Sequence, residues 1–417
     1  MARGRRLRSL PGAFLRPVRS SALVPSVARR RSRRVSTPKA AYRGDPPEAR
    51  ETQEAGTDLF CELALTVAAL ADIQGLRSFT LPYPGFAQRA FDRTVARCLD
   101  IGRRPPRSLP EMWEWCRSLT ASDPLFGVPA SFVAPDARLV HPVGVMPTRT
   151  CLEVASHRHA AGVDAEVRAL LDGLLARCGS DERFLRCRRF LARNPVVHQE
   201  DRFAVRRNKA GWNNDAWAKV KEFYRPVPEF LYVEDVALRC PTCGLPALTH
   251  DRTVPLPGSP MAAEEAWCEG EECPRDGGLE LIRKPKLALV QPRSLRVFLA
   301  LPHAVGEEAL SMLEAAGIGW SSVAGELGTY RLRETGGETM EVRIRDRLEP
   351  GLLAAGIAHS PPSADRTFVV VPQRLADREG YRARFLSALP ASLRERMVLT
   401  TPTGLVPGIR GEGRADA

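Results

Sequence analysis

The sequence of 417 residues lacks several patterns that would assign it to a well-defined class of proteins. A membrane-spanning helix needs about 20 consecutive apolar residues. No apolar run reaches that length, so we expect no membrane partner. A Walker phosphate loop, a Rossmann glycine fingerprint and a Gly-x-Ser-x-Gly elbow are also missing, so nothing favours chemistry on ATP, dinucleotides or acyl groups. The seven histidines are scattered and form no ligand cluster of their own.

Acidic residues are absent from residues 1–43, which contain twelve Arg and one Lys. Without this arm the net charge of +12 becomes −1, so the basic charge belongs to the arm. The arm has no steady periodicity, and we expect residues 1–56 to form a disordered arm and a polar linker. Its composition resembles that of an organellar transit peptide. The bias toward Ala, Arg, Gly and Pro continues through the chain and suggests a bacterial source, so we favour a nucleic-acid-binding tail or a start codon assigned too far upstream.

Four cysteines are the sharpest chemical signal in the sequence. They follow the spacing C-x2-C-x24-C-x4-C and are Cys240, Cys243, Cys268 and Cys273. Two closely spaced pairs can offer four thiolates at tetrahedral positions, which is the arrangement of a structural Zn²⁺ site. Pro241 and Gly244 favour the tight turn that a metal knuckle needs. The sequence therefore predicts a zinc ribbon over residues 231–290, with a pair of disulfides or ordinary buried thiols as the alternatives.

The other six cysteines are isolated within apolar or helical stretches, where a free thiol behaves as a small hydrophobic group. They are Cys61, Cys98, Cys116, Cys151, Cys178 and Cys187. This usage is typical of a reducing compartment, so we expect a cytoplasmic protein.

Residues 57–230 are predicted to form a mainly helical domain. Apolar residues recur at helical spacing over the ranges 58–71, 86–99, 164–178 and 181–193, and a further helix begins at Pro110. Gly179 is expected to end one of these helices and Ser180 to cap the next.

A basic segment lies between Arg183 and Arg225. It contains twelve Lys or Arg, only four acidic residues, and several aromatic residues interleaved with them. Because the body of the chain is close to neutral, this concentration predicts a phosphate-binding surface. The residues that we expect to contact nucleic acid are Arg206, Arg207, Lys209, Trp212 and Trp217. The alternative is a solvated helix face whose aromatic residues belong to the core.

Residues 291–405 are predicted to fold as an α/β domain, followed by a disordered tail at 406–417. The expected order is a helix at 306–316, strands at 318–323, 329–333 and 340–346, a helix at 352–357 and a strand at 368–371. This order, α-β-β-β-α-β, is that of the restriction-endonuclease-like PD-(D/E)xK core. We therefore expect a multidomain protein with a helical domain, a zinc ribbon and a nuclease-like domain.

The third of these strands alternates between apolar and charged residues. Met340, Val342 and Ile344 form its apolar face, and Glu341, Arg343 and Arg345 are expected on the opposite face. Nucleases of this fold carry metal-binding acids and a Lys there, and the Lys follows the last acid by two residues. This strand instead reads Glu-x-Arg-x-Arg.

Several segments resemble a known family, the restriction-endonuclease-related proteins encoded beside prokaryotic PIWI-RE proteins and a helicase in three-gene defence islands. The segments are Leu295-Arg-Val-Phe-Leu-Ala-Leu-Pro, Met340-Glu-Val-Arg-Ile-Arg-Asp-Arg-Leu-Glu-Pro-Gly-Leu-Leu-Ala and Thr367-Phe-Val-Val-Val-Pro. The segment Met146-Pro-Thr-Arg-Thr-Cys-Leu-Glu-Val-Ala is similar to the helical domain that precedes the ribbon in that family, domain Y. The resemblance implies a role in defence, with DNA or another nucleic acid, the PIWI-RE protein and the helicase as partners.

The chain departs from that family at three catalytic positions. Matching Asp346 and Pro350 to the family pattern places the third-strand acid at Arg343 and the lysine at Arg345, while the second-strand acid falls on Arg331. Arginine cannot coordinate Mg²⁺ and stays protonated, so it cannot act as a general base.

The leading hypothesis is accordingly a nuclease-shaped domain that no longer cuts and binds phosphates through these arginines. Two alternatives remain open. Glu341, with Glu308 or Glu307, could still hold Mg²⁺ in an active endonuclease. The chain could also be a zinc-stabilised scaffold that binds proteins and no nucleic acid.

Overall fold

The computed structural model describes residues 47–74, 81–144, 146–157, 163–198, 213–256, 258–259, 265–273, 278–323, 326–333 and 337–411. All of them belong to the unit Pro46–Ala417. The basic arm therefore lies outside the described residues, as do Arg206, Arg207, Lys209 and Trp212. No helix in the described ranges is both long and apolar enough to cross a membrane.

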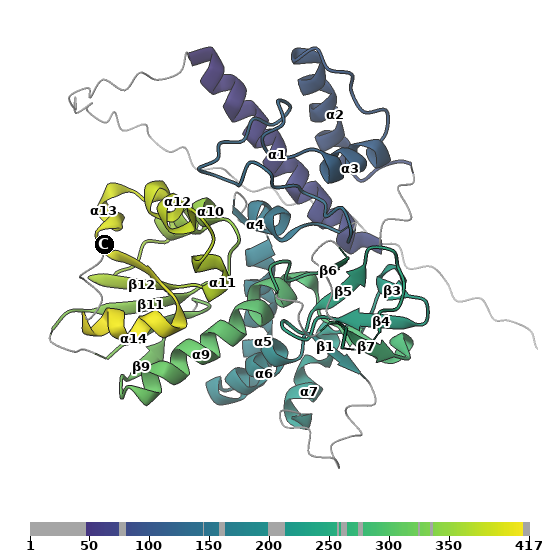
Figure 1. The fold of residues 1–417 in the computed structure, drawn as a ribbon. Coiled ribbons are helices and arrows are strands. Elements are labelled where there is room, and N and C mark those ends of the chain that lie inside the picture. The colour runs from purple at the N-terminus through teal and green to yellow at the C-terminus, as the bar shows by residue number, and fades with distance from the viewer. Residues whose placement is uncertain are drawn as a thin grey trace, which may run out of the picture. The chain divides into compact units, whose positions relative to one another are not determined.

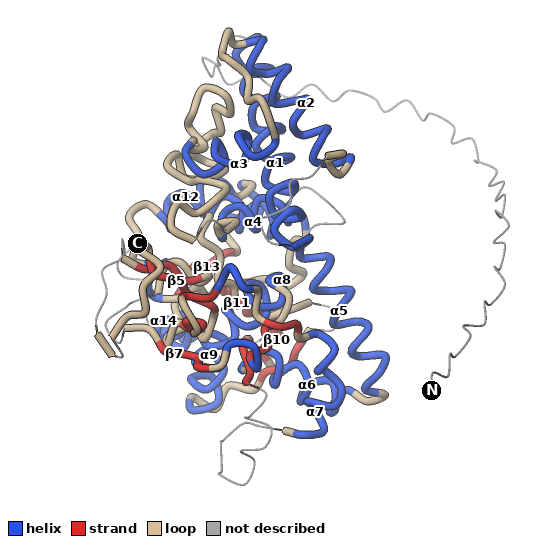
Figure 2. Tube along the Cα trace, turned by 90° about the vertical axis from the view of Figure 1, so that its right-hand side faces the viewer, coloured by secondary structure: helices blue, strands red, loops and turns tan. Residues whose placement is uncertain are grey.

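The N-terminal part is helical, as predicted (Figure 1). Its helices are α1 (Pro47–Gln74), α2 (Gly85–Asp100), α3 (Leu109–Ser118), α4 (Arg149–His157), α5 (Val163–Cys178) and α6 (Asp181–Arg193). The α1 helix buries Leu59, Phe60 and Leu63 and packs against α2 and α4. Figure 2 shows α5 and α6 side by side, and the short turn at residues 179–180 joins them.

Helix α1 begins earlier than the sequence predicts. Residues 47–56 read as a polar linker, yet they form its first turns. Glu, Ala, Gln and Arg in this stretch are strong helix formers, and the buried apolar residues from Leu59 onward anchor the helix. Gly56 fits closely against the loop that follows α3, because a Cβ added there would lie 2.0 Å from Phe126 O.

Helix ends follow the signals in the sequence. Ser108 caps α3 and Ser180 caps α6, and each side-chain oxygen accepts a hydrogen bond from the backbone N–H three residues later. Gly179 ends α5 with a left-handed backbone (φ +67°), as predicted.

Two small sheets occupy the middle of the chain. In the first, β8 (Ala288–Val290) pairs with β1 (Val196–His198) and β2 (Arg225–Pro226). Helix α7 (Asn214–Val220) lies between β1 and β2 in sequence. The second sheet carries the cysteines and contains β3 (Tyr232–Val233), β4 (Val236–Arg239), β5 (Pro246–Thr249), β6 (Ala266–Cys268) and β7 (Glu280–Arg283). Short 3₁₀ turns lie at residues 221–223, 229–231 and 285–287.

A continuous helical stretch leads into the last domain. It consists of α8 (Arg293–Leu295), a π turn (Arg296–Ala300) and α9 (Leu301–Ala315), so the helix starts before the predicted residue 306. The backbone N–H of Leu301 donates to Arg296 O, five residues back. This wider turn comes directly before Pro302, which has no N–H to donate.

The C-terminal region, which was predicted as the last domain, contains a five-stranded sheet with the order β13-β12-β11-β10-β9. Its strands are β9 (Trp320–Ser322), β10 (Thr329–Leu332), β11 (Met340–Ile344), β12 (Arg366–Val370) and β13 (Met397–Thr400). The β9–β10 and β10–β11 pairs are antiparallel, whereas the β11–β12 and β12–β13 pairs are parallel. With α10 (Pro350–His359) between β11 and β12, the elements from α9 to β12 follow the predicted order of helix, three strands, helix and strand.

Helices cover both faces of this sheet (Figure 1). Apolar residues of α9 and α14 (Pro402–Arg410) pack on the face that carries Val342 and Phe368. Residues of α10 and α12 (Tyr381–Ala388) pack on the opposite face, around Val369. The short helices α11 (Gln373–Ala376) and α13 (Ala391–Arg394) complete this layer.

The C-terminal helix corrects a prediction. Residues 406–410 were expected in a disordered tail but belong to α14. Thr401 caps this helix through its hydroxyl, and Gly411 ends it with a φ of +78°. Pro407 and two glycines make the segment read as a loop, while its buried Leu405 fixes it to the sheet.

The last domain and the helical part meet backbone to backbone at one point. Gly351, in the first turn of α10, leaves no room for a side chain, because a Cβ there would lie 2.1 Å from Ser131 O. The helix therefore rests directly on the loop that precedes α4.

Replacing Gly56 by Ala should lower the melting temperature. Gly to Ala in a helix interior normally stabilises by about 1 kcal/mol, but here the Cβ would collide with Phe126 O, at 2.0 Å. Gly173→Ala in α5 is the matched control, since nothing lies within 4 Å of its Cβ, and it should raise the melting temperature. A stabilising Gly56→Ala would contradict the close packing of α1 on this loop.

Candidate metal centre and basic cleft

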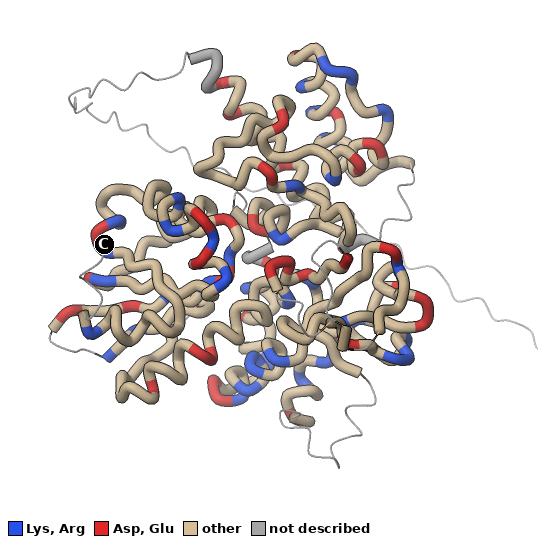
Figure 3. The backbone as a smooth tube through the Cα atoms, viewed as in Figure 1, with Lys and Arg blue, Asp and Glu red and all other residues tan. Residues whose placement is uncertain are grey.

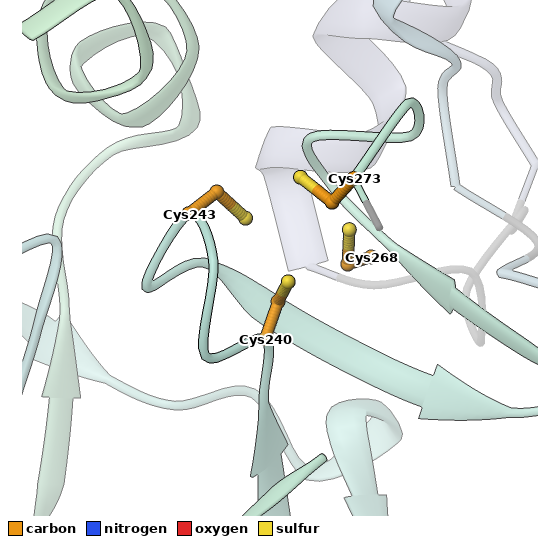
Figure 4. A group of neighbouring side chains, drawn as sticks. All are labelled: Cys240, Cys243, Cys268 and Cys273. Carbon is orange, nitrogen blue, oxygen red and sulfur yellow. The ribbon is translucent and has the colours of Figure 1, made fainter. Parts of the chain in front are cut away.

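The four predicted cysteines converge on one point in the ribbon (Figure 4). Their sulfur atoms point toward one another and all lie within 4.8 Å of each other. Cys240 and Cys243 come from the turn between β4 and β5, where Gly244 has a φ of +71° and donates its N–H to Cys240 O. Cys268 ends β6, and Cys273 follows a short loop. The tight turn predicted from Pro241 and Gly244 is therefore confirmed.

The surroundings of the sulfurs fit a bound metal ion. All ten cysteines are free thiols, which favours a metal site over the disulfide alternative. Contacts among the four thiols lower the pKa of Cys240 and raise the pKa of Cys243 and Cys268, so they favour one thiolate in the group. A thiolate is the form that binds metal. Gly270 leaves the space beside the sulfurs open, because a Cβ there would lie 2.8 Å from Cys273 Sγ. Among the described residues this is the single group of three or more Cys, His, Asp or Glu able to share a metal ion.

A buried arginine joins the ribbon to the rest of the protein. Arg149, at the start of α4, has no exposed surface. Its Nη1 donates to Gly270 O at 3.2 Å, and its Nη2 donates to Asp346 O and Oδ1 at 2.7 and 2.9 Å. Its backbone N–H donates to Glu271 Oε1 at 2.9 Å. Burial by itself lowers the pKa of Arg149, but the Asp346 and Glu153 carboxylates outweigh this effect and raise it.

Buried carboxylates extend these contacts into α10. Glu153, one turn after Arg149, accepts the N–H groups of Leu348 and Glu349 at 2.9 and 3.1 Å. Glu349 in turn accepts the Ala134 N–H at 2.9 Å and the Thr150 hydroxyl at 3.0 Å. Burial raises the pKa of both carboxyl groups.

A second arginine binds the loop between Cys268 and Cys273. Glu269 is fully buried, and Arg296 Nε donates to its Oε2 at 2.5 Å while Arg296 Nη2 donates to its Oε1. Arg296 lies in the π turn before α9. We call the six charged residues in these contacts the buried ionic network: Arg149, Glu153, Glu269, Arg296, Asp346 and Glu349.

Sequence reasoning missed this network, although all of its residues except Glu269 lie in segments that carry the family resemblance. Arg149 and Glu153 are four residues apart, the spacing at which opposite charges pair along a helix. In the sequence, Asp346 was used only to match the third strand to the family pattern. Nothing in a single sequence shows that these charges are buried and meet each other.

The predicted nuclease face holds an internal ion pair. Glu341 and Arg343 are both buried, and Arg343 Nε donates to Glu341 Oε1 at 2.5 Å. Arg343 also donates to Ser360 O at 2.7 Å and lies 3.6 Å from Glu326 Oε2. A guanidinium group therefore neutralises the carboxylate that was predicted to bind Mg²⁺.

The other two arginines of this face have different surroundings. Arg345 Nη1 donates to Leu327 O and Ile344 O, each at 2.8 Å, so this side chain holds the loop before β10. Arg331 is exposed and lies opposite Glu341 across the β10–β11 ladder. Two of the three predicted phosphate-binding arginines thus already have partners within the chain.

The proposed carboxylate pair does not come together. Glu308 is an exposed residue of α9, which covers the face of Val342. Glu341 neighbours Val342 in β11, so its side chain points to the other face. The sheet therefore separates Glu308 from Glu341, which disfavours a metal ion shared by these two carboxylates.

A cleft of about 1300 Å³ opens beside the end of β11. Its arginines come from two walls: Arg168, Arg188, Arg189 and Arg193 from α5 and α6, and Arg343, Arg345 and Arg347 from β11 and the residues after it. Figure 3 shows basic positions along α6, which lies beside α9. The cleft is therefore basic on both walls.

The acidic residues of the cleft are mostly neutralised. Glu153 and Asp346 belong to the buried ionic network, Glu307 pairs with Arg193 and lies 3.4 Å from His303 Nε2, and Glu326 lies near Arg343. Burial, with smaller contributions from the α6 arginines, lowers the pKa of His303. Within the described residues, Arg188 and Arg189 make no hydrogen bond or ion pair and remain available to a ligand.

Trp217 is the one described member of the predicted aromatic and basic set. It lies on α7, half-buried, with its ring centre 5.2 Å from that of Tyr224 and 6.2 Å from that of Phe190. These contacts favour the alternative stated for this residue, in which the ring belongs to the core.

Comparison with known proteins finds one family that resembles part of the chain. Residues 59–198 match the family model described as pPIWI_RE three-gene island domain Y. This part of the chain is therefore similar to domain Y, in agreement with the resemblance seen in the sequence, and the match includes α4 with Arg149 and Glu153. It ends at His198, before the ribbon and the last domain. No curated protein and no solved structure matches the chain.

Replacing Cys240 and Cys243 by Ser should abolish metal binding. Purified wild-type protein should contain about one tightly bound metal ion per chain, because four cysteines form one closed site. Elemental analysis checks this, with Cys116→Ser as the control, since Cys116 is a buried thiol outside the cluster. Equal metal content in the double variant and the wild type would contradict the site.

Proposed function

We propose that this protein is a nucleic-acid-directed component of a prokaryotic PIWI-RE-type defence system, and that it binds nucleic acid in the basic cleft without cutting it. Domain Y supplies the link to the three-gene islands. The observation that carries the binding role is the set of arginines on both walls of one cleft, with Arg188 and Arg189 free to contact a ligand.

The charge of the cleft suits a phosphate backbone. Arginine binds phosphate oxygens through two parallel N–H groups, and its charge does not depend on a metal ion or on pH. Arg188 and Arg189 can contact the phosphates of a strand directly, while the arginines at the end of β11 make the opposite wall positive. Such contacts give affinity without reading sequence. DNA is the ligand that the nuclease relationship favours.

The last domain is interpreted as a restriction-endonuclease-like core whose catalytic site is degenerate. The order of α9, β9, β10, β11, α10 and β12 supports the fold. The Arg343–Glu341 pair supports the loss of activity, because the cation beside the carboxylate is a side chain that cannot activate water. We accordingly divide the chain into the domain Y-like part (57–230), the ribbon (231–290) and this domain (291–405).

The metal of the ribbon is proposed to be zinc. Four thiolates in a closed group suit Zn²⁺, which has no redox chemistry and accepts tetrahedral sulfur ligands. Its role would be structural, since the cysteines fill all four positions. The free thiols throughout the chain agree with a reducing cytoplasm.

The partners are proposed from the domain Y match. The PIWI-like protein and the helicase of the same island would act on the nucleic acid that this chain holds. Neither partner is needed for the binding that the cleft arginines provide, so the binding can be measured with the purified chain.

Replacing Arg188 and Arg189 by Ala should weaken DNA binding and reduce its dependence on salt. Each lost phosphate contact lowers the slope of log affinity against log salt by about one. Arg183→Ala with Arg186→Ala is the matched control, because these arginines lie on the same helix α6 outside the cleft lining. Fluorescence anisotropy with labelled DNA over a salt series measures both quantities. Equal losses in the two double variants would refute the cleft as the binding site.

Purified protein should leave plasmid DNA intact in the presence of Mg²⁺ or Mn²⁺. The reason is that a guanidinium already neutralises Glu341 and no group of three carboxylates or histidines exists among the described residues. Gel analysis after long incubation checks this. If the wild type cuts and Glu341→Gln abolishes cutting, the active-endonuclease alternative is correct.

A further inference from the structure

Three successive residues of the ribbon each contact another part of the chain. They lie in the loop between Cys268 and Cys273, which we call the knuckle loop (residues 269–272). Glu269 binds Arg296, Gly270 O accepts a hydrogen bond from the Arg149 side chain, and Glu271 accepts one from the Arg149 backbone. The loop that carries the metal ligands is therefore also the loop that holds Arg149.

The shape of the knuckle loop depends on the cysteines on either side of it. Gly270 lies so close to Cys273 Sγ and Cys243 Sγ that a Cβ would come within 2.8 and 3.1 Å of them. Glu271 adopts a left-handed backbone with a φ of +57°, which a glutamate seldom occupies without constraint. A metal ion that draws the four sulfurs together would fix this loop, because structural metal binding is coupled to folding.

The Arg149 side chain contacts both this loop and the wall of the cleft. Its Nη2 holds Asp346, which lines the cleft between Arg345 and Arg347. Arg374 Nη2 donates to the second oxygen of the same carboxylate at 2.6 Å. Arg149 Nη1 and Nη2 thus connect the knuckle loop and the cleft wall through one rigid, planar group.

We propose that the metal ion in the cysteine cluster sets the conformation of the cleft wall at residues 345–349, and that Arg149 is the positioning residue that transmits it. The importance of that wall rests on the proposed function, but the coupling is a property of the chain alone. It can therefore be measured without nucleic acid.

The first experiment compares the full chain with Zn²⁺ bound and after removal of the metal by a chelator. Hydrogen–deuterium exchange should become roughly tenfold faster at residues 345–349. Exchange in α2 should stay unchanged, which shows that the helical part remains folded. Gly270→Ala should give the same faster exchange, because it crowds the sulfurs while leaving every charged partner in place. Gly173→Ala, in open space on α5, is its control.

The second experiment separates a positioning role from a merely structural one. Lysine keeps the charge of Arg149 but cannot donate to Gly270 O and Asp346 at the same time with a planar fork. Arg149→Lys should still bind one Zn²⁺, yet its exchange at 345–349 should already be fast and should no longer respond to the chelator. The wild type and Arg149→Lys, each with and without the metal ion, form a thermodynamic cycle. It measures the effect of the metal and of the substitution separately and together.

Two results would overturn the proposal. One is unchanged exchange at 345–349 when the wild type loses its metal. The other is an equal response to the chelator in the wild type and in Arg149→Lys, which would show that the coupling does not pass through this residue. If DNA binding is absent while the metal still controls exchange, the proposed function fails and the coupling stands.

Discussion

Burial of the Arg149 guanidinium is the constraint on which the arrangement of the three parts depends. A buried charge is tolerated only where partners surround it, and removing one partner of a buried pair costs about 3–5 kcal/mol. Here the partners come from the ribbon, from α4 and from the residues after β11. A shift of the ribbon or of the residues after β11 would remove a hydrogen-bond partner of this buried guanidinium, so the cleft wall at Asp346 is held in place.

Local features of the fold could be predicted from the sequence because they depend on neighbouring residues. Ser180 as a helix cap, Gly179 as a stop and the alternation of Met340, Val342 and Ile344 in β11 are all confirmed. The thiol cluster could be predicted from spacing. The start of α1 and the helix α14 could not, since tertiary packing of Leu59 and Leu405 overrides a polar or glycine-rich composition there.

The candidate site was predicted only in part, because it also depends on contacts between residues that are far apart in the sequence. The sequence places Glu341 and Arg343 on one face but cannot show that they bind each other, and it offers Glu308 as a metal ligand although a sheet lies between the two carboxylates. The cleft arginines of α5 and α6 become a surface only when α9 and β11 are placed beside them. Long-range placement decides which charges meet, and a single sequence carries little of that information.

The contact of Gly351 with Ser131 O limits how this protein can evolve by exchange of parts. Because Ser131 O would lie 2.1 Å from a Cβ at position 351, only glycine fits there; on the loop the contact is a backbone oxygen, which any residue would supply. A recombinant that joined residues 59–198 to a C-terminal sheet from another protein would need a glycine at the position of Gly351, because any side chain there would collide with the loop. This contact therefore constrains the exchange of either segment alone.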